Sequence, residues 1–405
     1  MASSDTPQPA LPIVILGSTG SIGESTLRVV DRYPSKVSVV GLATGSNWER
    51  LAQQARRYNP AVVGLDDPAN ANALRTALSG FPGTVLTGPG AVETVAAWPG
   101  VETAVVAIVG FNGVRPTLAA IRAGHHVALA NKETLVAAGS LVTAEARRAG
   151  VAIAPIDSEH SAIWQCLRAG HASEVRRLIL TASGGPFRQR PLSTFTAITP
   201  EEALAHPTWK MGSRITIDSA TMMNKGFEII EAAWLFDVKP PRIDVVIHPQ
   251  SIVHSMVEFM DNSVIAQLGP PDMTLPIAYA LFGPSRPLAP IEAPRLDISG
   301  LGSLEFEIPD PVRYPALDLA RRAFAAGSTA PTVLNAADEV AVAAFLDGRI
   351  RFPAIVDLAA EAVATHSFAS RPSIDDITEA DMWAREFVNQ KVRGTYTLQR
   401  VPADS

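Results

Sequence analysis

Near its start, the chain carries an apolar segment that leads into a glycine-rich loop and then into a helical pattern. The apolar segment is Leu11–Leu16, the loop reads Gly-Ser-Thr-Gly-Ser-Ile-Gly over residues 17–23, and the helical pattern covers residues 24–32. In that order, glycines let backbone N–H groups approach a pyrophosphate at the positive end of the helix. The spacing departs from the Gly-x-Gly-x-x-Gly fingerprint, and a plain tight turn is the alternative. The order of the elements favours a dinucleotide-binding domain.

The second strand-like segment indicates which dinucleotide is bound. It covers residues 37–42, and the chain continues Ala-Thr-Gly-Ser-Asn-Trp-Glu-Arg. NAD-binding folds usually end this strand with an acid for the ribose 2′-hydroxyl, and that acid is missing here. Hydroxyl, amide and guanidinium groups stand where a 2′-phosphate would sit, so we predict NADP(H). Arg50, Arg56 and Arg57 can equally be solvated helix charges.

Further strand-like segments alternate with helical patterns up to about residue 156. They cover residues 61–65, 103–109 and 126–130. This alternation predicts a doubly wound, Rossmann-like α/β domain. The segment Asn131–Thr134 follows a strand end, where it either closes over the nicotinamide or simply begins an N-capped helix.

An acidic pair, Asp157 and Glu159, follows the apolar run Val151–Ile156. Such a run predicts a buried parallel strand that reaches the carboxyl edge of its sheet, where open α/β folds bind ligands. Side chains two apart on an extended segment point the same way, so the two carboxylates can converge. Paired carboxylates repel unless a proton or cation separates them, and their hard oxygens suit Mg²⁺ or Mn²⁺. Solvated acids at a strand end are the alternative.

Two segments after the acidic pair are predicted to be substrate-binding loops. Residues 178–187 form a strand that runs into Ser-Gly-Gly-Pro-Phe, a loop of small residues suited to an anion, although a simple turn competes. Residues 200–212 lack helical or strand periodicity yet contain a Trp and a Met. Irregular loops of this kind are often lids that expel water.

The densest functional signal covers residues 218–228. It predicts an N-capped helix that brings Asn224, Lys225 and Glu228 to neighbouring positions. Asn224 and Lys225 can hold a phosphate, and Glu228 can reach toward the acidic pair as a third metal ligand. The alternative is a surface helix with a Lys–Glu pair. A glycine within the helix costs about 1 kcal/mol, which calls for a packing or functional reason.

The remaining sequence adds two histidines and a helical C-terminal region. His248 and His254 each have the ordinary explanation of a satisfied structural residue. A Pro-rich linker, residues 284–294, precedes a small bundle of helices. The helical patterns cover residues 317–326, 332–346, 354–365 and 379–392.

Length and composition favour a cytosolic enzyme of several domains. The 405 residues are too many for one core and predict two or three domains. A net charge of -6 argues against a nucleic-acid surface. Cys166 is the only cysteine, which excludes an intrachain disulfide and favours a reducing compartment. We expect no membrane span and no signal peptide, with residues 1–10 as a flexible tail.

Taken together, the motifs resemble those of the 1-deoxy-D-xylulose 5-phosphate reductoisomerase family of the non-mevalonate isoprenoid route. The similarity spans nearly the whole chain and depends on the order of the motifs. They lie at residues 17–23, 130–133, 157–160, 183–187, 222–226 with Glu228, and 248–251.

The resemblance implies a specific activity. We expect NADPH- and divalent-metal-dependent rearrangement and reduction of 1-deoxy-D-xylulose 5-phosphate to 2-C-methyl-D-erythritol 4-phosphate, with Mg²⁺, Mn²⁺ or Co²⁺, by a cytoplasmic homodimer. One alternative is a metal-assisted NADP-dependent dehydrogenase of another polyol phosphate. A second is a non-catalytic NADP(H)-binding redox sensor, which would not need a three-carboxylate site and a phosphate-binding set.

The expected domains and site residues follow from the same resemblance. An NADPH-binding domain covers residues 1–156, an α+β catalytic and dimerisation domain 157–288, a linker 289–314 and a C-terminal α-helical domain 315–405. The metal ligands are Asp157, Glu159 and Glu228. The substrate-binding residues are Ser158, Ser183, His206, Ser219, Asn224, Lys225 and Glu228. The catalytic positions are Lys132, Glu159, His206, Trp209, Met211 and His254. The cofactor-binding residues are Ser18, Thr19, Gly20, Ser21, Ile22, Gly45, Ser46, Asn47, Asn131, Lys132, Glu133 and Gly212.

Two positions depart from the family pattern. Ser46 stands where the family often has Lys or another cation beside the 2′-phosphate, so the residue that reads this phosphate is open. Lys210 occupies a lid position that is often small and polar.

Overall fold

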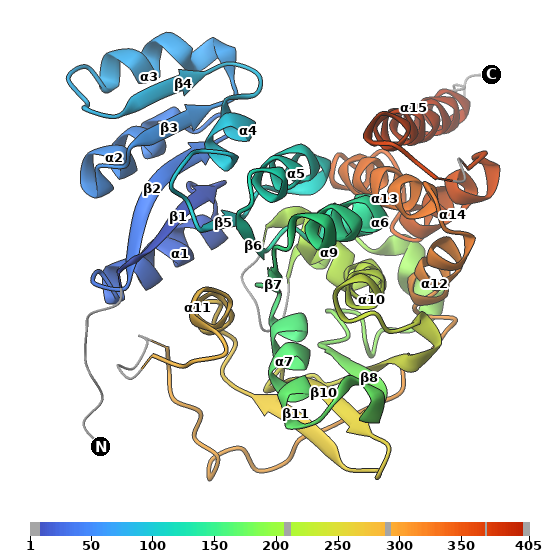
Figure 1. Cartoon of the computed structure of the whole chain (residues 1–405). Coiled ribbons are helices and arrows are strands. Elements are labelled where there is room, and N and C mark those ends of the chain that lie inside the picture. Colours follow the sequence, from blue (N-terminus) through green and yellow to red (C-terminus); the bar gives the residue numbers. More distant parts are fainter. Residues whose placement is uncertain (1–8, 206–211, 288–292, 369–370, 400–405) are drawn as a thin grey trace. The chain divides into compact units, whose positions relative to one another are not determined.

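The computed structural model describes residues 9–205, 212–287, 293–368 and 371–399 (Figure 1). Contacts between residues divide the chain into two units. The first unit comprises Met1–Asn131, Val142–Ser161 and Asp272–Pro294, and the second comprises Lys132–Leu141, Ala162–Pro271 and Arg295–Ser405. The domain boundaries expected at residues 156, 288 and 314 stay predictions.

The first unit is built on a seven-stranded parallel sheet of order β4-β3-β2-β1-β5-β6-β7 (Figure 1). Its strands are β1 (Leu11–Leu16), β2 (Val37–Thr44), β3 (Val62–Leu65), β4 (Thr84–Thr87), β5 (Thr103–Val106), β6 (His126–Leu129) and β7 (Ile153–Pro155). The apolar runs form strands because a parallel sheet covered on both faces buries them completely: Ile13, Ile15 and Leu42 have no exposed surface. The predicted doubly wound fold is confirmed.

The strand order reverses at β1, which defines where this unit binds a ligand. In open α/β sheets the crevice lies at the carboxyl ends of the strands beside such a reversal, here between β1 and β5. The helices of this unit are α1 (Ser21–Arg32), α2 (Trp48–Tyr58), α3 (Ala71–Ala77), α4 (Ala91–Ala96), α5 (Val114–Arg122) and α11 (Thr274–Phe282). Helix α11 packs on α1, with Tyr33 and Phe282 in edge-to-face contact at 5.3 Å.

The second unit contains a four-stranded mixed sheet of order β11-β10-β8-β9. Strands β8 (Val175–Ala182) and β9 (Ile243–Ile247) are parallel, while β10 (Val253–Phe259) is antiparallel to β8 and to β11 (Val264–Leu268). Helices α8 (Pro200–Leu204), α9 (Ser213–Thr221) and α10 (Met223–Phe236) belong to this unit. Helices α6 (Lys132–Ala149) and α7 (Ser158–Cys166) contribute residues to both units.

Four C-terminal helices complete the second unit, as the sequence predicts. They are α12 (Ala316–Ala326), α13 (Ala330–Leu346), α14 (Ala354–Thr365) and α15 (Ile374–Gln399), the last being longer than expected. Helix α13 is apolar on most sides because it lies in the core, where Val333, Leu334 and Ala337 are fully buried. In the part of the chain that the structure describes, no helix combines the length and the apolar character that a membrane crossing requires.

Three local predictions are wrong. Residues 157–159 are not extended, because β7 ends at Pro155 and α7 begins at Ser158. Residues 200–204 form α8, whose capping box between Thr199 and Glu202 was overlooked. Residues 218–228 are not one helix, because Met222 adopts a left-handed conformation (φ 62°) that ends α9 and precedes α10.

Candidate active site

The glycine loop after β1 is held in a conformation that only glycine allows at two positions. Gly17 has φ 86°, and a Cβ there would lie 2.4 Å from the carbonyl oxygen of Ala107. A Cβ on Gly23 would lie 2.4 Å from the carbonyl oxygen of Gly17. Gly20 precedes α1 without a side-chain cap, and the first N–H groups of a helix have no partner within the helix. Backbone donors grouped in this way suit a pyrophosphate.

A buried glutamine supports this loop and was not identified from the sequence. Gln54, on α2, is 3% exposed. The Ser18 hydroxyl donates to Gln54 Oε1 at 2.7 Å, and Gln54 Nε2 donates to the Ser18 carbonyl at 2.9 Å and to Glu24 Oε1 at 2.8 Å. Gln54 therefore ties the loop to the first turn of α1 through a buried amide whose two ends are both used.

The arginines after β2 are bound to protein groups. Arg50 donates from Nε and Nη2 to the two Glu24 oxygens at 2.6 and 2.8 Å, and these bonds lower the pKa of Glu24. Arg57 pairs with Asp31 at 2.8 Å, and Arg56 donates to a backbone carbonyl.

The groups at the exposed end of β2 have no net charge. Gly45, Ser46 and Asn47 are exposed, and the Asn47 side chain caps α2 by accepting the Arg50 N–H at 3.2 Å. The hydroxyl of Thr19, on the glycine loop, lies 2.6 Å from the hydroxyl of Thr44 at the end of β2. The polar groups at this end of the strand are therefore hydroxyl and amide groups.

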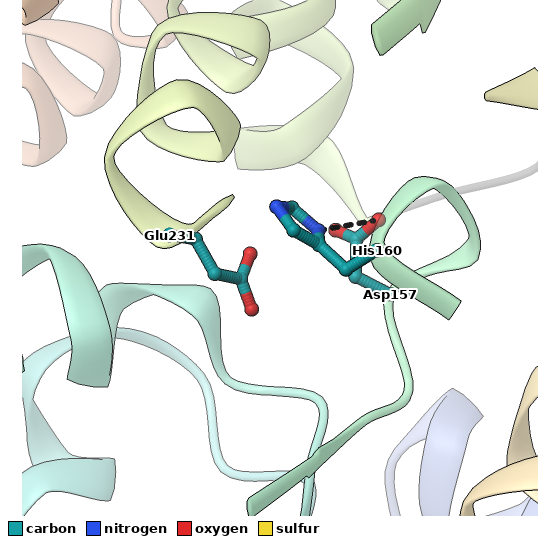
Figure 2. Close-up of side chains that lie close together, drawn as sticks. All are labelled: Asp157, His160 and Glu231. Carbon is teal, nitrogen blue, oxygen red and sulfur yellow. Dashed lines mark ion pairs between the residues drawn. The ribbon is translucent and has the colours of Figure 1, made fainter. Parts of the chain in front are cut away.

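The acidic pair lies at the beginning of α7. Asp157 Oδ1 accepts the backbone N–H of Glu159 at 3.2 Å, and the Ser158 hydroxyl donates to the Glu159 carboxylate. The Nδ1 of His160, a fully buried residue, lies 3.5 Å from Asp157 Oδ1 (Figure 2). The start of a helix favours negative charge, so this position suits an acidic pair.

A buried carboxylate in the second unit is surrounded by cationic and amide donors. Glu228, on α10, is 1% exposed. Its Oε1 accepts from Lys132 Nζ at 2.8 Å and from Asn224 Nδ2 at 2.6 Å, and its Oε2 pairs with Lys225. Lys132 also donates to Asn224 Oδ1 at 2.7 Å. The predicted neighbourhood of Asn224, Lys225 and Glu228 is confirmed, and the alternative of a surface helix is wrong because the group is buried.

The glycine inside α10 has a packing reason. A Cβ on Gly226 would lie 2.9 Å from the Cβ of Ala320 on α12 and 3.2 Å from the carbonyl oxygen of Ala316. Glycine therefore lets α10 and α12 approach closely, which offsets its cost within a helix.

The loop of small residues after β8 packs against the end of α9. Gly184 and Gly185 have φ of 82° and 67°, and a Cβ on Gly185 would lie 2.8 Å from the Ser219 carbonyl oxygen. The Gly185 N–H donates to the Ser183 hydroxyl at 3.3 Å. The Ser219 hydroxyl donates to the Ile215 carbonyl at 2.9 Å. Two serines predicted to bind phosphate thus lie on adjoining segments of one unit.

The two histidines of the 248–257 segment differ. His248 Nε2 accepts the backbone N–H groups of Ile252 and Val253, both at 3.1 Å, and its Nδ1 lies 2.8 Å from the Glu305 carbonyl oxygen, so it has a structural role. His254 is buried, and burial lowers the pKa of its imidazole despite hydrogen bonds to backbone carbonyls. Burial therefore favours the neutral form of His254.

Family models and relatives match almost the entire chain. A 1-deoxy-D-xylulose 5-phosphate reductoisomerase model matches residues 13–139, a model of that enzyme's C-terminal domain matches residues 153–236, and a DXP reductoisomerase C-terminal domain model matches residues 268–387. The reductoisomerase of Heliobacterium modesticaldum is 52% identical over 382 residues, which cover 94% of this chain and 97% of that protein. The chain belongs to the 1-deoxy-D-xylulose 5-phosphate reductoisomerase family.

Solved structures of the reductoisomerase family are similar over the same extent. The Zymomonas mobilis enzyme in complex with NADPH is 42% identical with a TM-score of 0.89, and the match covers 95% of this chain and 99% of that one. A DOX-P reductoisomerase in complex with NADPH, fosmidomycin and magnesium is 39% identical with a TM-score of 0.89, covering 95% and 98% of the two chains.

Within this reductoisomerase fold, the lid residues predicted from the sequence lie outside the described residues. They are His206, Trp209 and Met211.

Other residues predicted for the site lie at the ends of helices or in loops. Gly212 precedes α9, Lys132 begins α6, and the Asn131 side chain donates to the Gly110 carbonyl at 3.0 Å. The sequence analysis missed Gln54 and Arg214, because their partners are separated from them by many residues.

Proposed function

We propose that the chain converts 1-deoxy-D-xylulose 5-phosphate to 2-C-methyl-D-erythritol 4-phosphate, using NADPH and one divalent cation. The observation that carries this proposal is the buried Lys132–Asn224–Lys225–Glu228 group within a chain of this family. Burying a carboxylate and two ammonium groups is costly, which argues for a role in binding or catalysis. A redox sensor would need the glycine loop but not this group.

The first unit is proposed to bind NADPH. The glycine loop fits a pyrophosphate, since side chains at Gly17 or Gly23 would collide with the backbone. Because Arg50 is engaged by Glu24, we assign the 2′-phosphate to the exposed side chains of Ser46 and Asn47.

Asp157, Glu159 and Glu228 are proposed to hold the cation. The family resemblance implies these three ligands, and their carboxylate oxygens suit Mg²⁺ and Mn²⁺. When bound, the cation supplies Lewis acidity that stabilises negative charge on the substrate's ketone and hydroxyl oxygens.

The protein's own residues are proposed to hold and orient the substrate. Lys225 and Asn224, together with Ser183 and Ser219, provide donors for the phosphate. The phosphate is remote from the reacting carbons, so its binding energy can orient the substrate. Ser158 lies beside the acidic pair and is assigned to a substrate hydroxyl.

Three further positions are assigned to the surroundings of the reacting carbons. Lys132, whose ammonium is fixed by two acceptors, provides positive charge. His254 lines the site as a neutral donor. The segment that carries His206, Trp209 and Met211 is assigned to covering the substrate and excluding water.

We further propose a cytoplasmic homodimer that forms through the edge of the second unit's sheet. Strand β11 pairs with β10 on one side, and Val264, Ile265 and Leu268 on it are 47%, 38% and 37% exposed. An edge strand with exposed apolar residues is a template for pairing with another chain. A second copy of this chain satisfies that edge.

A direct spectrophotometric assay tests the function. The protein is mixed with NADPH, Mg²⁺ and 1-deoxy-D-xylulose 5-phosphate, and absorbance at the nicotinamide band is followed while the product is identified. We expect NADPH consumption that requires all three components and yields 2-C-methyl-D-erythritol 4-phosphate. NADPH binding without turnover would instead support the sensor, and turnover of only another polyol phosphate would support the dehydrogenase.

A further inference from the structure

A buried ion network centred on Arg214 connects helices of the second unit. Arg214 is in the first turn of α9, and its side chain is 15% exposed. It donates to Glu339 Oε2 at 2.9 Å and Asn335 Oδ1 at 2.8 Å on α13, and to Glu133 Oε1 at 3.3 Å on α6. One guanidinium thereby fixes three helices in a single geometry.

Two carboxyl groups lie beside this guanidinium. Asp218 Oδ2 is 3.6 Å from Arg214 Nε, and Asp338 Oδ2 is 3.8 Å from Arg214 Nη2. The exposed fraction is 4% for Asp218 and 0% for Asp338. Among the described residues, no N–H or hydroxyl donor bonds to either Asp338 oxygen.

The two buried aspartates lie beside one cation. Asp218 and Asp338 both approach the Arg214 guanidinium, and two ionised carboxylates held there would repel one another unless one is protonated. Burial raises the pKa of Asp218 to about 6, against the opposing effect of Arg214, and burial together with the Asp218 charge raises the pKa of Asp338 well above the usual range. Burial therefore favours a neutral carboxyl group in this pair.

A fourth helix, α15, contributes to the network. Arg385 on α15 pairs with Glu339 at 3.1 Å and with Asp381 at 2.7 Å. Asp218 is on α9 and Asp338 is on α13. The charged groups that act on them are Arg214 on α9, Lys132 and Glu133 on α6, and Glu339 on α13, while Arg385 on α15 reaches the network through Glu339.

The network ends next to residues assigned to the substrate. Ser219 follows Asp218 directly, and Lys132 precedes Glu133 directly. Any displacement of α9 or of the first turn of α6 therefore moves a group that we assign to the phosphate or to the reacting carbons.

We propose that Arg214 and the buried Asp218–Asp338 pair are positioning residues through which the C-terminal helices fix Ser219 and Lys132 for the substrate. The network acts mainly on the binding of the sugar phosphate. The kinetic part of the test rests on the proposed function, whereas the thermal part does not.

The kinetic test compares Arg214→Met with Arg322→Met, a control that removes an exposed cation paired with Asp318 on α12. We expect Arg214→Met to lower kcat/KM for 1-deoxy-D-xylulose 5-phosphate on the order of 10–100-fold, since small misplacements are costly. Its Kd for NADPH, measured by fluorescence titration, should change by a much smaller factor than kcat/KM, and all parameters of Arg322→Met should match wild type. Unchanged kcat/KM, or an equal loss in NADPH binding, would overturn the proposal.

The thermal test uses Asp338→Asn, whose amide can donate to Asp218 without a titrating proton. Because the folded-state pKa of Asp338 is raised, its contribution to stability is complete below the ordinary aspartate pKa and is lost as pH rises through the folded value. The wild-type Tm should therefore fall relative to that of Asp338→Asn between pH 5 and pH 9. Parallel Tm curves would contradict a protonated Asp338 in the folded protein and with it the role of the aspartate pair, and this can be measured even if Arg214→Met does not fold.

Discussion

The two units hold their candidate functional groups in opposite ways. In the first, the loop after β1 presents backbone N–H groups, and it is supported by one buried neutral amide, Gln54, and by the Glu24–Arg50 pair, whose side chains are 34% and 45% exposed. In the second, the groups are charged side chains, and Lys132, Lys225 and Glu228 are almost completely buried. Backbone donors need only the correct chain path, whereas buried charges also depend on every partner. Substitutions should therefore have milder effects in the first unit than in the second.

The largest expected effect comes from removing the cation. Exhaustive chelation should abolish turnover, because the carboxylates assigned as ligands cannot themselves polarise the substrate oxygens. NADPH binding, measured by fluorescence titration, should be nearly unchanged, since the glycine loop contains no metal ligand. Readdition of Mg²⁺ serves as the control. Turnover that survives chelation would refute the assignment of Asp157, Glu159 and Glu228.

The next effect separates two neighbours on α10. Lys225→Ala should lower kcat/KM by about 2–4 kcal/mol in transition-state stabilisation, because it removes a charge-assisted contact to the phosphate. Glu228→Gln keeps the shape of the side chain but weakens a metal ligand, so excess Mg²⁺ should partly restore its activity. The measurement is kcat/KM as a function of metal concentration. If both variants respond alike to metal, the assignment of phosphate binding to Lys225 and of metal binding to Glu228 is wrong.

A smaller effect is expected in the cofactor loop. Gln54→Ala leaves the buried Ser18 hydroxyl and carbonyl without their partner, which costs about 1–3 kcal/mol. Because the loop is assigned to the pyrophosphate common to both dinucleotides, Kd should rise by the same factor for NADPH and NADH. Gln53→Ala, at the exposed neighbouring position, should leave both values unchanged. A loss confined to NADPH would move the role of Gln54 to the 2′-phosphate.

The smallest effect concerns cofactor choice. The protein should prefer NADPH to NADH in kcat/KM, because no acid ends β2. Since Arg50 is bound to Glu24 and partly exposed, Arg50→Ala should change this preference by only about 0.2–1 kcal/mol. Ser46→Glu, which brings a negative charge to the exposed end of β2, should reverse it. Equal use of both dinucleotides by wild type would reject the predicted preference, and a large loss in Arg50→Ala would show that Arg50 leaves Glu24 for the phosphate.

The sequence predicted the features that depend on local pattern. Buried parallel strands have continuous apolar runs, so β1, β2, β3, β5 and β6 were located from the sequence, and helical periodicity located α12 to α15. The neighbourhood of Asn224, Lys225 and Glu228 follows from helical spacing alone.

The features that failed depend on distant partners or on rare backbone conformations. A methionine in the left-handed region gives no local signal, so the division between α9 and α10 was missed. Asp218 was predicted to cap a helix, yet it lies beside Arg214 within the core. The Arg214 partners on α13 lie more than a hundred positions further along the chain, so no local sequence window contains both.

The left-handed residue Met222 constrains how the sequence can change length. It joins two helices that contribute to one site, with Ser219 before the junction and Asn224 and Lys225 after it. An added residue turns all later positions of an α-helix by about 100°, so one inserted between Ser219 and Asn224 would turn the serine and the lysine away from a common ligand. Insertions before α9 have no such consequence. Natural variation in length should therefore be tolerated ahead of α9 and absent from the four residues between Ser219 and Asn224.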